Sequence, residues 1–334
     1  MAVYTAIDNP ELYFQVKTYT GNGTAIGSGG LAVTLDGSED MQPDFVWIKE
    51  RNNATNHQVY DAVRGATNRI YTDGSFIEDA NSEGLTAFGS NGFTLGNDGS
   101  SNGSSDTYVA WCWKESATAG FDILTFDGNE TNRTISHSLS AVPHLMILKA
   151  RAGATDLAVN HQSIGTYGLH LNNTQASGAE TTWWQSTLPT SSVFSVGTSA
   201  TTNDSGESMV AYLWTEKQGF SKFGSYTGNG NADGAFIYTG FKPAWVMIKR
   251  TDSIDGWLIV DNKRAGYNAG NNVLEADVTS AEDTSVADRV DILSNGFKLR
   301  NSWSKINTSG GTYIYMAFAE APFVNSNGVP CNAR

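Results

Sequence analysis

The sequence predicts an all-β protein made of three tandem β-sandwich repeats, of jelly-roll or lectin-like type, with about 100 residues in each. Three observations lead to this prediction. One seven-residue segment occurs three times at regular intervals. Short aromatic and β-branched runs are separated by clusters of Gly, Asn, Asp and Ser, which mark turns. Long helical periodicity is missing, although 334 residues leave ample room for it.

The recurring segment begins with proline, continues through at least four apolar residues and ends with lysine. An unbroken apolar run of this length is typical of a strand that is buried on both faces. Proline has no N–H to donate to a sheet, so it fits the first residue of such a strand. We interpret each copy as the central strand of its own repeat. The copies are residues 43–49, 143–149 and 243–249.

The spacing of these copies divides the chain into three repeats between two short terminal segments. The links between repeats are too short to act as free tethers, so we expect neighbouring repeats to touch. The predicted parts are an N-terminal arm (1–13), repeat 1 (14–118), repeat 2 (119–218), repeat 3 (219–324) and a C-terminal tail (325–334).

Two further strands are expected beside each central strand. The opening strand ends in a glycine- and asparagine-rich turn, because these residues adopt positive φ at little cost. After the central lysine, a polar loop leads into a returning strand, which is the pattern of a hairpin. The opening turns are residues 19–23, 126–129 and 226–230. The returning strands are residues 58–61, 157–160 and 257–261.

Each repeat ends with an alternating strand and a closing strand. The alternating strand carries Asn-Gly-Phe-x-Leu in repeats 1 and 3, and repeat 2 keeps the strand without Asn-Gly. The closing strand has large residues on one face, and we expect that face to fill the gap between two sheets about 10 Å apart. The alternating strands are residues 91–95, 193–196 and 295–299. The closing strands are residues 108–113, 209–214 and 313–318.

Composition excludes several classes of protein. The formal net charge is −13 and no basic stripe exists, which argues against binding to nucleic acid or to an anionic membrane. Cys112 and Cys331 are too far apart to indicate a disulfide framework. No run of about 18 apolar residues predicts a membrane span. Residues 1–10 lack the features of a signal peptide, so we expect synthesis in a cytoplasm without export.

No catalytic signature is present, and we predict a protein that is not an enzyme and carries no cofactor or metal. A nucleophile elbow, a phosphate loop and a dinucleotide fingerprint are all missing. The five histidines lack metal-ligand spacing, and the acidic loops at 36–40 and 97–99 do not match a calcium loop. A carboxylate pair for glycoside hydrolysis stays open, although no acidic pair recurs in all three repeats.

Two kinds of charged residue recur at matching positions. Asp61 with Arg64, and Asp261 with Arg264, would either line a ligand pocket or form an ion pair that pins a turn, and we favour the ion pair. Repeat 2 has His161 and Ile164 instead. The strand-ending lysines are expected to bury their stems while the ammonium groups reach water. A Schiff-base role would require a desolvated pocket. These lysines are Lys49, Lys149 and Lys249.

Three tryptophans in polar, loop-like stretches are the candidate binding residues. Trp183, Trp184 and Trp303 would suit stacking on a sugar or contact with another protein. The alternative is that these rings close the open end of a sandwich.

Three motifs together resemble a repeat family of virion structural proteins from marine tailed phages. The motifs are the Tyr-Thr-Gly-Asn-Gly opening, the Pro-x-x-Val-x-Ile-Lys strand and the Asn-Gly-Phe-x-Leu strand. Residues 6–15 and 311–323 are similar to the two ends of such proteins. The resemblance covers nearly the whole chain and implies a structural component of a phage particle. It carries over no catalytic or binding residues.

The resemblance implies a non-enzymatic virion protein, made in the host cytoplasm, that lies in a tail fibre or tail appendage and presents an adhesive surface. A capsid decoration protein and a lectin-like carbohydrate-binding module are the alternatives, and a virion-borne glycan hydrolase is the least favoured. The expected partners are other virion proteins and a host surface glycan or receptor, without nucleic acid or membrane insertion. Because virion appendages are usually symmetric, we expect a homo-oligomer, with a trimer as the first choice.

Overall fold

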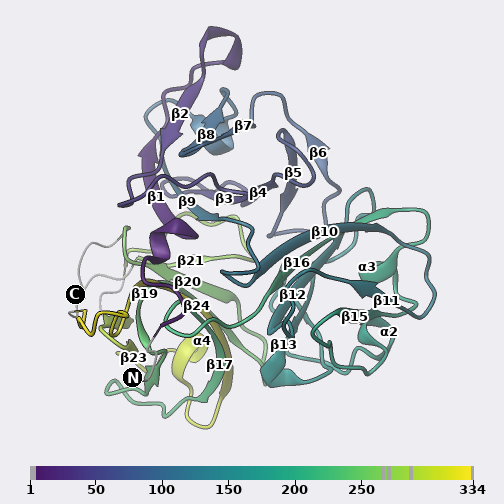
Figure 1. Ribbon diagram of the computed structural model, residues 1–334, viewed down its shortest axis with the longest axis vertical. Helices are drawn as coiled ribbons and strands as arrows, with labels where there is room; N and C mark the ends of the chain where they lie inside the picture. The colour runs from purple at the N-terminus through teal and green to yellow at the C-terminus, as the bar shows by residue number, and fades with distance from the viewer. Residues whose placement is uncertain (1–4, 265–267, 269–271, 286–288, 332–334) are drawn as a thin grey trace.

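The computed structural model describes residues 5–264, 268, 272–285 and 289–331 (Figure 1). Strands dominate this part of the chain, so the all-β prediction is confirmed. The strands form antiparallel sheets, and Figure 1 shows the larger sheets arranged around a common centre. Among the described residues, no helix is long and apolar enough to cross a membrane.

Three large sheets share one strand order, which runs from the opening strand through the closing, central and returning strands to a short outer strand. The first sheet contains β1 (Phe14–Thr20), β9 (Thr107–Trp113), β3 (Phe45–Glu50), β4 (Gln58–Asp61), β5 (Asn68–Tyr71) and β6 (Asp79–Ala80). The second contains β10 (Phe121–Asp127), β16 (Ser208–Trp214), β12 (Leu145–Ala150), β13 (Ala158–His161) and β14 (Leu169–His170). The third contains β17 (Ser221–Thr227), β24 (Thr312–Pro322), β19 (Phe241–Arg250), β20 (Trp257–Asp261) and β21 (Leu274–Glu275).

A smaller sheet accompanies each large one. These sheets are β2 (Leu31–Thr34), β8 (Gly92–Leu95) and β7 (Leu85–Gly89); β11 (Arg133–Ser136) and β15 (Val193–Val196); and β18 (Phe236–Tyr238), β23 (Gly296–Leu299) and β22 (Val290–Leu293). The one-turn helices are α1 (Gly99–Asn102), α2 (Thr181–Trp184), α3 (Ala200–Asn203) and α4 (Ser304–Asn307). The 3-10 turns are η1 (Pro10–Leu12), η2 (Ile26–Ser28) and η3 (Gln162–Ile164).

The central strands occupy the middle of the large sheets, as their sequence predicts. β3 and β12 are buried at every residue, and in β19 only Lys242 and Arg250 are partly exposed. Each central strand pairs with its returning strand in the predicted hairpin, for example Trp47 opposite Val59. The unbroken apolar run is explained because one face meets the small sheet of its own repeat and the other meets the neighbouring repeats.

The molecule has one shared core in addition to a separate core inside each repeat. The shared core joins rings from all three repeats: Phe45 lies 4.9 Å from Tyr212 and Trp113 lies 5.5 Å from Trp245, measured between ring centroids. Ile7 of the N-terminal arm also lies in it. Large aromatic surface from all three repeats is therefore buried in one common cluster.

The large face of each closing strand points into the shared core, and the prediction that it fills its own sandwich is wrong. Trp111 and Trp113 lie in the shared core, whereas Ala110 and Cys112 on the opposite face lie in the core of repeat 1. The large residues of the other two closing strands lie in the same shared core. Alternation along the strand correctly separates the two faces, but it does not say which face meets which neighbour.

The terminal segments fold against the rest of the chain. Ala6 donates its N–H to Gln218 O at 2.8 Å, which places the arm beside the link that precedes repeat 3. The tail meets the arm, where Ser326 N donates to Asp8 Oδ1 at 2.7 Å. The tail also contacts repeat 3, where Cys331 N donates to Phe323 O at 3.1 Å.

Candidate functional site

The three strand-ending lysines are fully buried, so the prediction that their ammonium groups reach water is wrong. Lys49, Lys149 and Lys249 each have no exposed surface. Lys49 Nζ donates to Glu50 O at 2.9 Å at the end of its own strand, to Asn53 O at 3.3 Å in the following loop, and to Thr279 O at 3.1 Å in repeat 3. The lysine is buried because the loop that follows it and a loop from another repeat both close over its end.

The other two lysines make related contacts. Lys249 Nζ donates to Asp255 O in its own loop and to Thr174 O of repeat 2 at 3.0 Å. Lys149 Nζ donates to Gly153 O at 2.7 Å. Burial lowers the pKa of all three lysines to about 8. Their backbone partners hold the ammonium groups in place, and a side chain without exposed surface gives a carbonyl substrate no route to the amine.

Asp61 and Arg64 form a buried pair that extends across the boundary between repeats 1 and 2. Arg64 N donates to Asp61 Oδ1 at 2.7 Å, which pins the turn after β4 as predicted. The Arg64 guanidinium also binds Glu78 at 2.8 Å, and Glu78 binds Arg151 of repeat 2 at 2.6 Å. Tyr212 of repeat 2 donates its hydroxyl to Asp61 Oδ2 at 2.7 Å. The pair is therefore one end of an inter-repeat network.

The boundary between repeats 3 and 1 carries the same network. Arg264 binds Asp261 and reaches Glu282 at 3.0 Å. Glu282 in turn binds Arg51 of repeat 1 at 2.9 Å. Trp111 takes the place of the tyrosine and donates Nε1–H to Asp261 Oδ2 at 3.0 Å.

The boundary between repeats 2 and 3 replaces every member of this network. The equivalent positions hold His161, Ile164, Ser177, Thr251 and Met316. Removing one member of a buried ionic network leaves its partners charged and unpaired, so the set is replaced together. Burial lowers the pKa of His161 to about 4, and its Nε2 lies 3.2 Å from Tyr315 O. This boundary thus keeps a polar contact without the carboxylates and guanidinium groups of the other two.

One backbone hydrogen bond recurs at all three boundaries. Glu78 N donates to Arg151 O at 2.6 Å, Ser177 N to Thr251 O at 2.9 Å, and Glu282 N to Arg51 O at 2.8 Å. The contacts run from repeat 1 to 2, from 2 to 3 and from 3 to 1, so they close a ring within a single chain. This is the head-to-tail arrangement of a cyclic trimer, built here from covalently joined repeats.

Three buried asparagines support the opening turns, and the sequence reasoning missed them. Asn102 Nδ2 donates to Gly96 O at 2.7 Å, and its Oδ1 accepts the N–H of Asn22 at 2.8 Å. Asn203 and Asn307 make equivalent bonds. Each asparagine stands six positions before the same point of its closing strand, at Tyr108, Met209 and Tyr313. That constant offset is the signal that could have found them.

Two of the three candidate tryptophans are buried and cannot act as exposed platforms. Trp183 and Trp184 are 4% and 1% exposed and lie in the core of repeat 2. They come from α2, which packs beside the two-stranded small sheet of that repeat. The alternative reading, in which these rings close the end of the sandwich, fits this placement. Neither ring is therefore open to a sugar, because both are buried among the apolar side chains of repeat 2.

Trp303 is only partly buried, but cations already contact its ring. The Arg289 guanidinium carbon lies 4.3 Å from the ring centroid, and Lys305 Nζ lies 5.3 Å from it. The indole borders a shallow depression of about 240 Å³ with Arg289, Asn301 and Ser302. The structure does not bring Trp303 together with Trp183 and Trp184, because it packs in repeat 3 and they pack in repeat 2.

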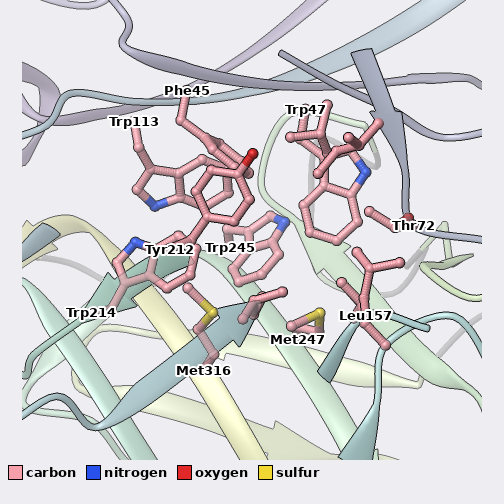
Figure 2. Close-up of a pocket in the computed structure, with 14 residues that line it drawn as sticks. Phe45, Trp47, Thr72, Trp113, Leu157, Tyr212, Trp214, Trp245, Met247 and Met316 are labelled. Atoms are coloured by element: carbon pink, nitrogen blue, oxygen red, sulfur yellow. The ribbon is translucent and has the colours of Figure 1, made fainter. Parts of the chain in front are cut away.

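A cavity of about 20 Å³ lies where the three repeats meet. Figure 2 shows the rings of Phe45, Trp113, Trp214 and Trp245 gathered around it. Its volume is close to the roughly 10–15 Å³ that one water occupies. The Thr72 hydroxyl at its edge already donates to Ala276 O at 2.6 Å. We therefore assign this cavity to packing rather than to ligand binding.

Metal-ligand clusters and reactive thiols are two further kinds of site to consider in the described part of the chain. No group of three or more His, Cys, Asp or Glu side chains there could hold a metal ion. Cys112 is buried, and burial raises the pKa of its thiol. Cys112 and Cys331 are both free thiols among the described residues.

Comparison with known families gives one match. A family model described as Domain of unknown function (DUF7483) matches residues 9–322. The chain belongs to the DUF7483 family. The DUF7483 match spans all three large sheets. No curated protein matches the chain.

Proposed function

We propose that this protein is a non-enzymatic structural component of a phage particle, most plainly a tail-fibre or tail-appendage protein that presents an adhesive surface. The closed ring of repeats around one aromatic core carries the proposal. The residues that recur in all three repeats, such as the buried lysines and asparagines, are used to hold the interior together. A chain whose repeated features are all architectural suits a building element better than a catalyst.

The sequence resemblance to phage virion repeats supports the same proposal. The motifs on which this resemblance rests lie at buried contacts. The opening turn is bound by a buried asparagine, and the central strand ends in a buried lysine. We further propose that each repeat is a jelly-roll or lectin-like β-sandwich that arose by duplication. The small sheet of each repeat packs on its large sheet through a core of its own, which supports this reading.

A capsid decoration protein is the second candidate, and the ring favours it. One chain offers three related outer surfaces around one axis, so a single copy would fit a threefold position that otherwise requires a trimer. A tail fibre would instead be expected to form a homo-oligomer. Native mass spectrometry of the purified protein distinguishes these cases. A monomer of 35.8 kDa supports the decoration role, and a trimer supports the fibre.

The test of virion membership is to purify intact particles and measure the protein in them. We expect it to co-purify with particles at a fixed stoichiometry to the major capsid protein, and labelled antibodies should place it on the tail or on the head. A chain that is abundant in infected cells and missing from purified particles would overturn the proposal. Release of reducing ends from host polysaccharide by the purified chain would support the glycan hydrolase instead.

A further inference from the structure

A half-open groove of about 170 Å³ lies on repeat 3, beside the outermost strand of its small sheet. One wall is the ring of Tyr238, which is 58% exposed. The groove is also lined by Glu216 and Lys222, whose charged groups lie 2.6 Å apart and remain partly exposed. The groove therefore combines an open aromatic ring with a charge-balanced pair of hydrogen-bonding groups.

The backbone beside the ring keeps it uncovered. Gly240 lines the same groove with φ at +84°, a conformation that side chains other than glycine rarely adopt. A Cβ placed there would lie 3.6 Å from the Tyr238 hydroxyl oxygen. The glycine thus leaves the edge of the ring open toward the groove.

The aromatic wall is special to repeat 3. On β18, Phe236 and Tyr238 point outward on either side of buried Ile237. Register against the neighbouring strand makes Ile237 equivalent to Val33 of repeat 1 and Ile135 of repeat 2. The outward neighbours in those repeats are Ala32 with Thr34, and Thr134 with Ser136. Two exposed rings have therefore replaced small residues at one copy of a repeated position, where the interior does not require them.

Small-molecule sites are concave and combine apolar or aromatic side chains with a few placed polar groups, and this groove offers the Tyr238 ring and one charged pair. A sugar ring has an apolar face that packs on an aromatic side chain and a rim of hydroxyls that both donate and accept hydrogen bonds. The Glu216 carboxylate accepts such bonds and the Lys222 ammonium donates them. The two charges cancel within the groove, and the chain carries −13 overall, so an anionic glycan gains nothing here.

We propose that this groove binds one residue of a neutral oligosaccharide, with Tyr238 as the stacking ring and the Glu216–Lys222 pair as partners of its hydroxyls. The inference rests on the adhesive role proposed above and moves that role from the tryptophans to repeat 3. The volume suits a single ring of a longer chain, because sites for drug-sized ligands occupy roughly 300–1,000 Å³.

The test is binding of the full chain to a printed array that carries neutral hexose and N-acetylhexosamine oligosaccharides beside carboxylated and sulfated ones. We expect retention on at least one neutral oligosaccharide. Tyr238→Ala should weaken that binding at least about tenfold, whereas Tyr238→Phe should stay within about threefold, since the ring is kept. Glu216→Gln should weaken it through loss of a charged acceptor.

Phe76→Ala is the matched control, because Phe76 is a half-exposed ring on repeat 1 and lies outside the groove. It should bind like the unchanged chain, and all variants should unfold at the same urea concentration. Binding that survives Tyr238→Ala, binding to acidic glycans alone, or no retention on any neutral glycan would each overturn the inference. Particle purification reports separately on the proposed function, since a chain that enters particles without binding glycan refutes only the groove.

Discussion

Tyr212 of the second repeat donates a hydrogen bond from its hydroxyl to the Asp61 carboxylate of the first repeat. The two oxygen atoms lie 2.7 Å apart across a buried boundary. In the third repeat, Asp261 accepts the same kind of bond from Trp111 of the first. Where the closing strand offers Met316 instead of a donor, the facing residue is His161 rather than aspartate. Donor and acceptor therefore change together, which indicates that these positions are coupled through the boundary they form.

Loss of that hydroxyl should destabilise the ring. Tyr212→Phe keeps the ring packing and removes one bond to a buried charged acceptor, so we expect the free energy of unfolding to fall by about 1.5–3 kcal/mol. Urea denaturation of the two proteins measures this difference in the free energy of unfolding. The exposed Tyr167 provides the control, because Tyr167→Phe should change stability by less than about 0.5 kcal/mol. Equal effects of the two substitutions would contradict the assigned contact.

Breaking the ion pair of Asp61 and Arg64 should lower the free energy of unfolding by more than the loss of the Tyr212 hydroxyl does. Arg64→Met leaves Asp61 buried without its guanidinium, and we expect a loss of about 3–5 kcal/mol. Ile164 occupies the same position in repeat 2, so Ile164→Met is the matched control, with an expected cost below about 1.5 kcal/mol. Differential scanning calorimetry of the two variants gives the comparison. A similar melting temperature for both would show that the network carries no stability.

Exchange of the four ionic members of the network together should be tolerated better than the single exchanges. The variant Asp61→His, Arg64→Ile, Glu78→Ser and Arg151→Thr installs four of the five residues found at the boundary between repeats 2 and 3 and leaves Tyr212 in place. We expect its loss of stability to be smaller than the sum of the four single losses, because no charge is left unpaired. Additive losses would show that the four positions act independently.

The buried asparagines should matter more than their neighbours. Asn203→Ala removes the acceptor of the Asn129 N–H and the donor to Gly197 O, and we expect a cost of about 2–4 kcal/mol. Thr201 lies in the same one-turn helix and is partly exposed, so Thr201→Ala should cost less than about 1 kcal/mol. Chemical denaturation at neutral pH checks both. The prediction fails if the two variants unfold at the same midpoint.

Stability should rise between pH 8 and about 9.5. Each buried lysine has a pKa of about 8 in the folded chain, against 10.5 for an ordinary lysine. The unfolded chain therefore holds more protons in this window, and each lysine adds a slope of up to about 1.4 kcal/mol per pH unit. Below pH 8 the cost of burying the charge is fully present. Above about pH 10 the buried tyrosines oppose the trend, since burial raises their pKa.

The matched variant for this prediction is Lys149→Met, which keeps the length of the stem and removes the charge. It should reduce the pH slope of the unfolding free energy by up to about 1.4 kcal/mol per pH unit, because the contribution of one buried lysine is lost. Urea unfolding at pH 8 and pH 9.5 gives the slope. An unchanged slope would show that Lys149 does not titrate in this window.

Two buried groups should oppose each other between pH 4 and 6. Burial raises the pKa of Asp73 to about 6, so this group makes the folded state less stable as pH rises. Burial lowers the pKa of His161 to about 4, so this group makes the folded state more stable as pH rises. Relative to the unchanged chain, Asp73→Asn should make the slope more positive and His161→Gln should make it more negative. Shifts of the same sign would contradict the assignment.

Local pattern predicted much of the fold. The unbroken apolar segments are buried strands, the segments that follow them return as hairpin partners, and neighbouring repeats touch. The pairing of Asp61 with Arg64 follows from their spacing around one turn. These features are accessible because each depends on residues close together in the chain, where hydrogen bonding and side-chain alternation repeat with a fixed period.

The candidate site was harder to predict from the sequence. The indole of Trp184 stands in a polar stretch of sequence and is nevertheless buried, since it packs into the apolar core of repeat 2. The sequence around Tyr238 is that of an ordinary strand. The exposure of its side chain follows from the outer position of β18 in its sheet. Neither outcome is contained in the neighbouring residues of the chain.

By itself, the sequence determined that this protein is built of strands, which residues share a face of each strand, and that one pattern recurs three times. Only the tertiary structure decided that the large faces meet in one shared core and that Lys49 is enclosed by a carbonyl from Thr279, 230 residues away. The reason is physical. Alternation specifies which side of a strand is apolar, but burial and charge pairing depend on the surface placed opposite, and in a closed ring another repeat supplies that surface.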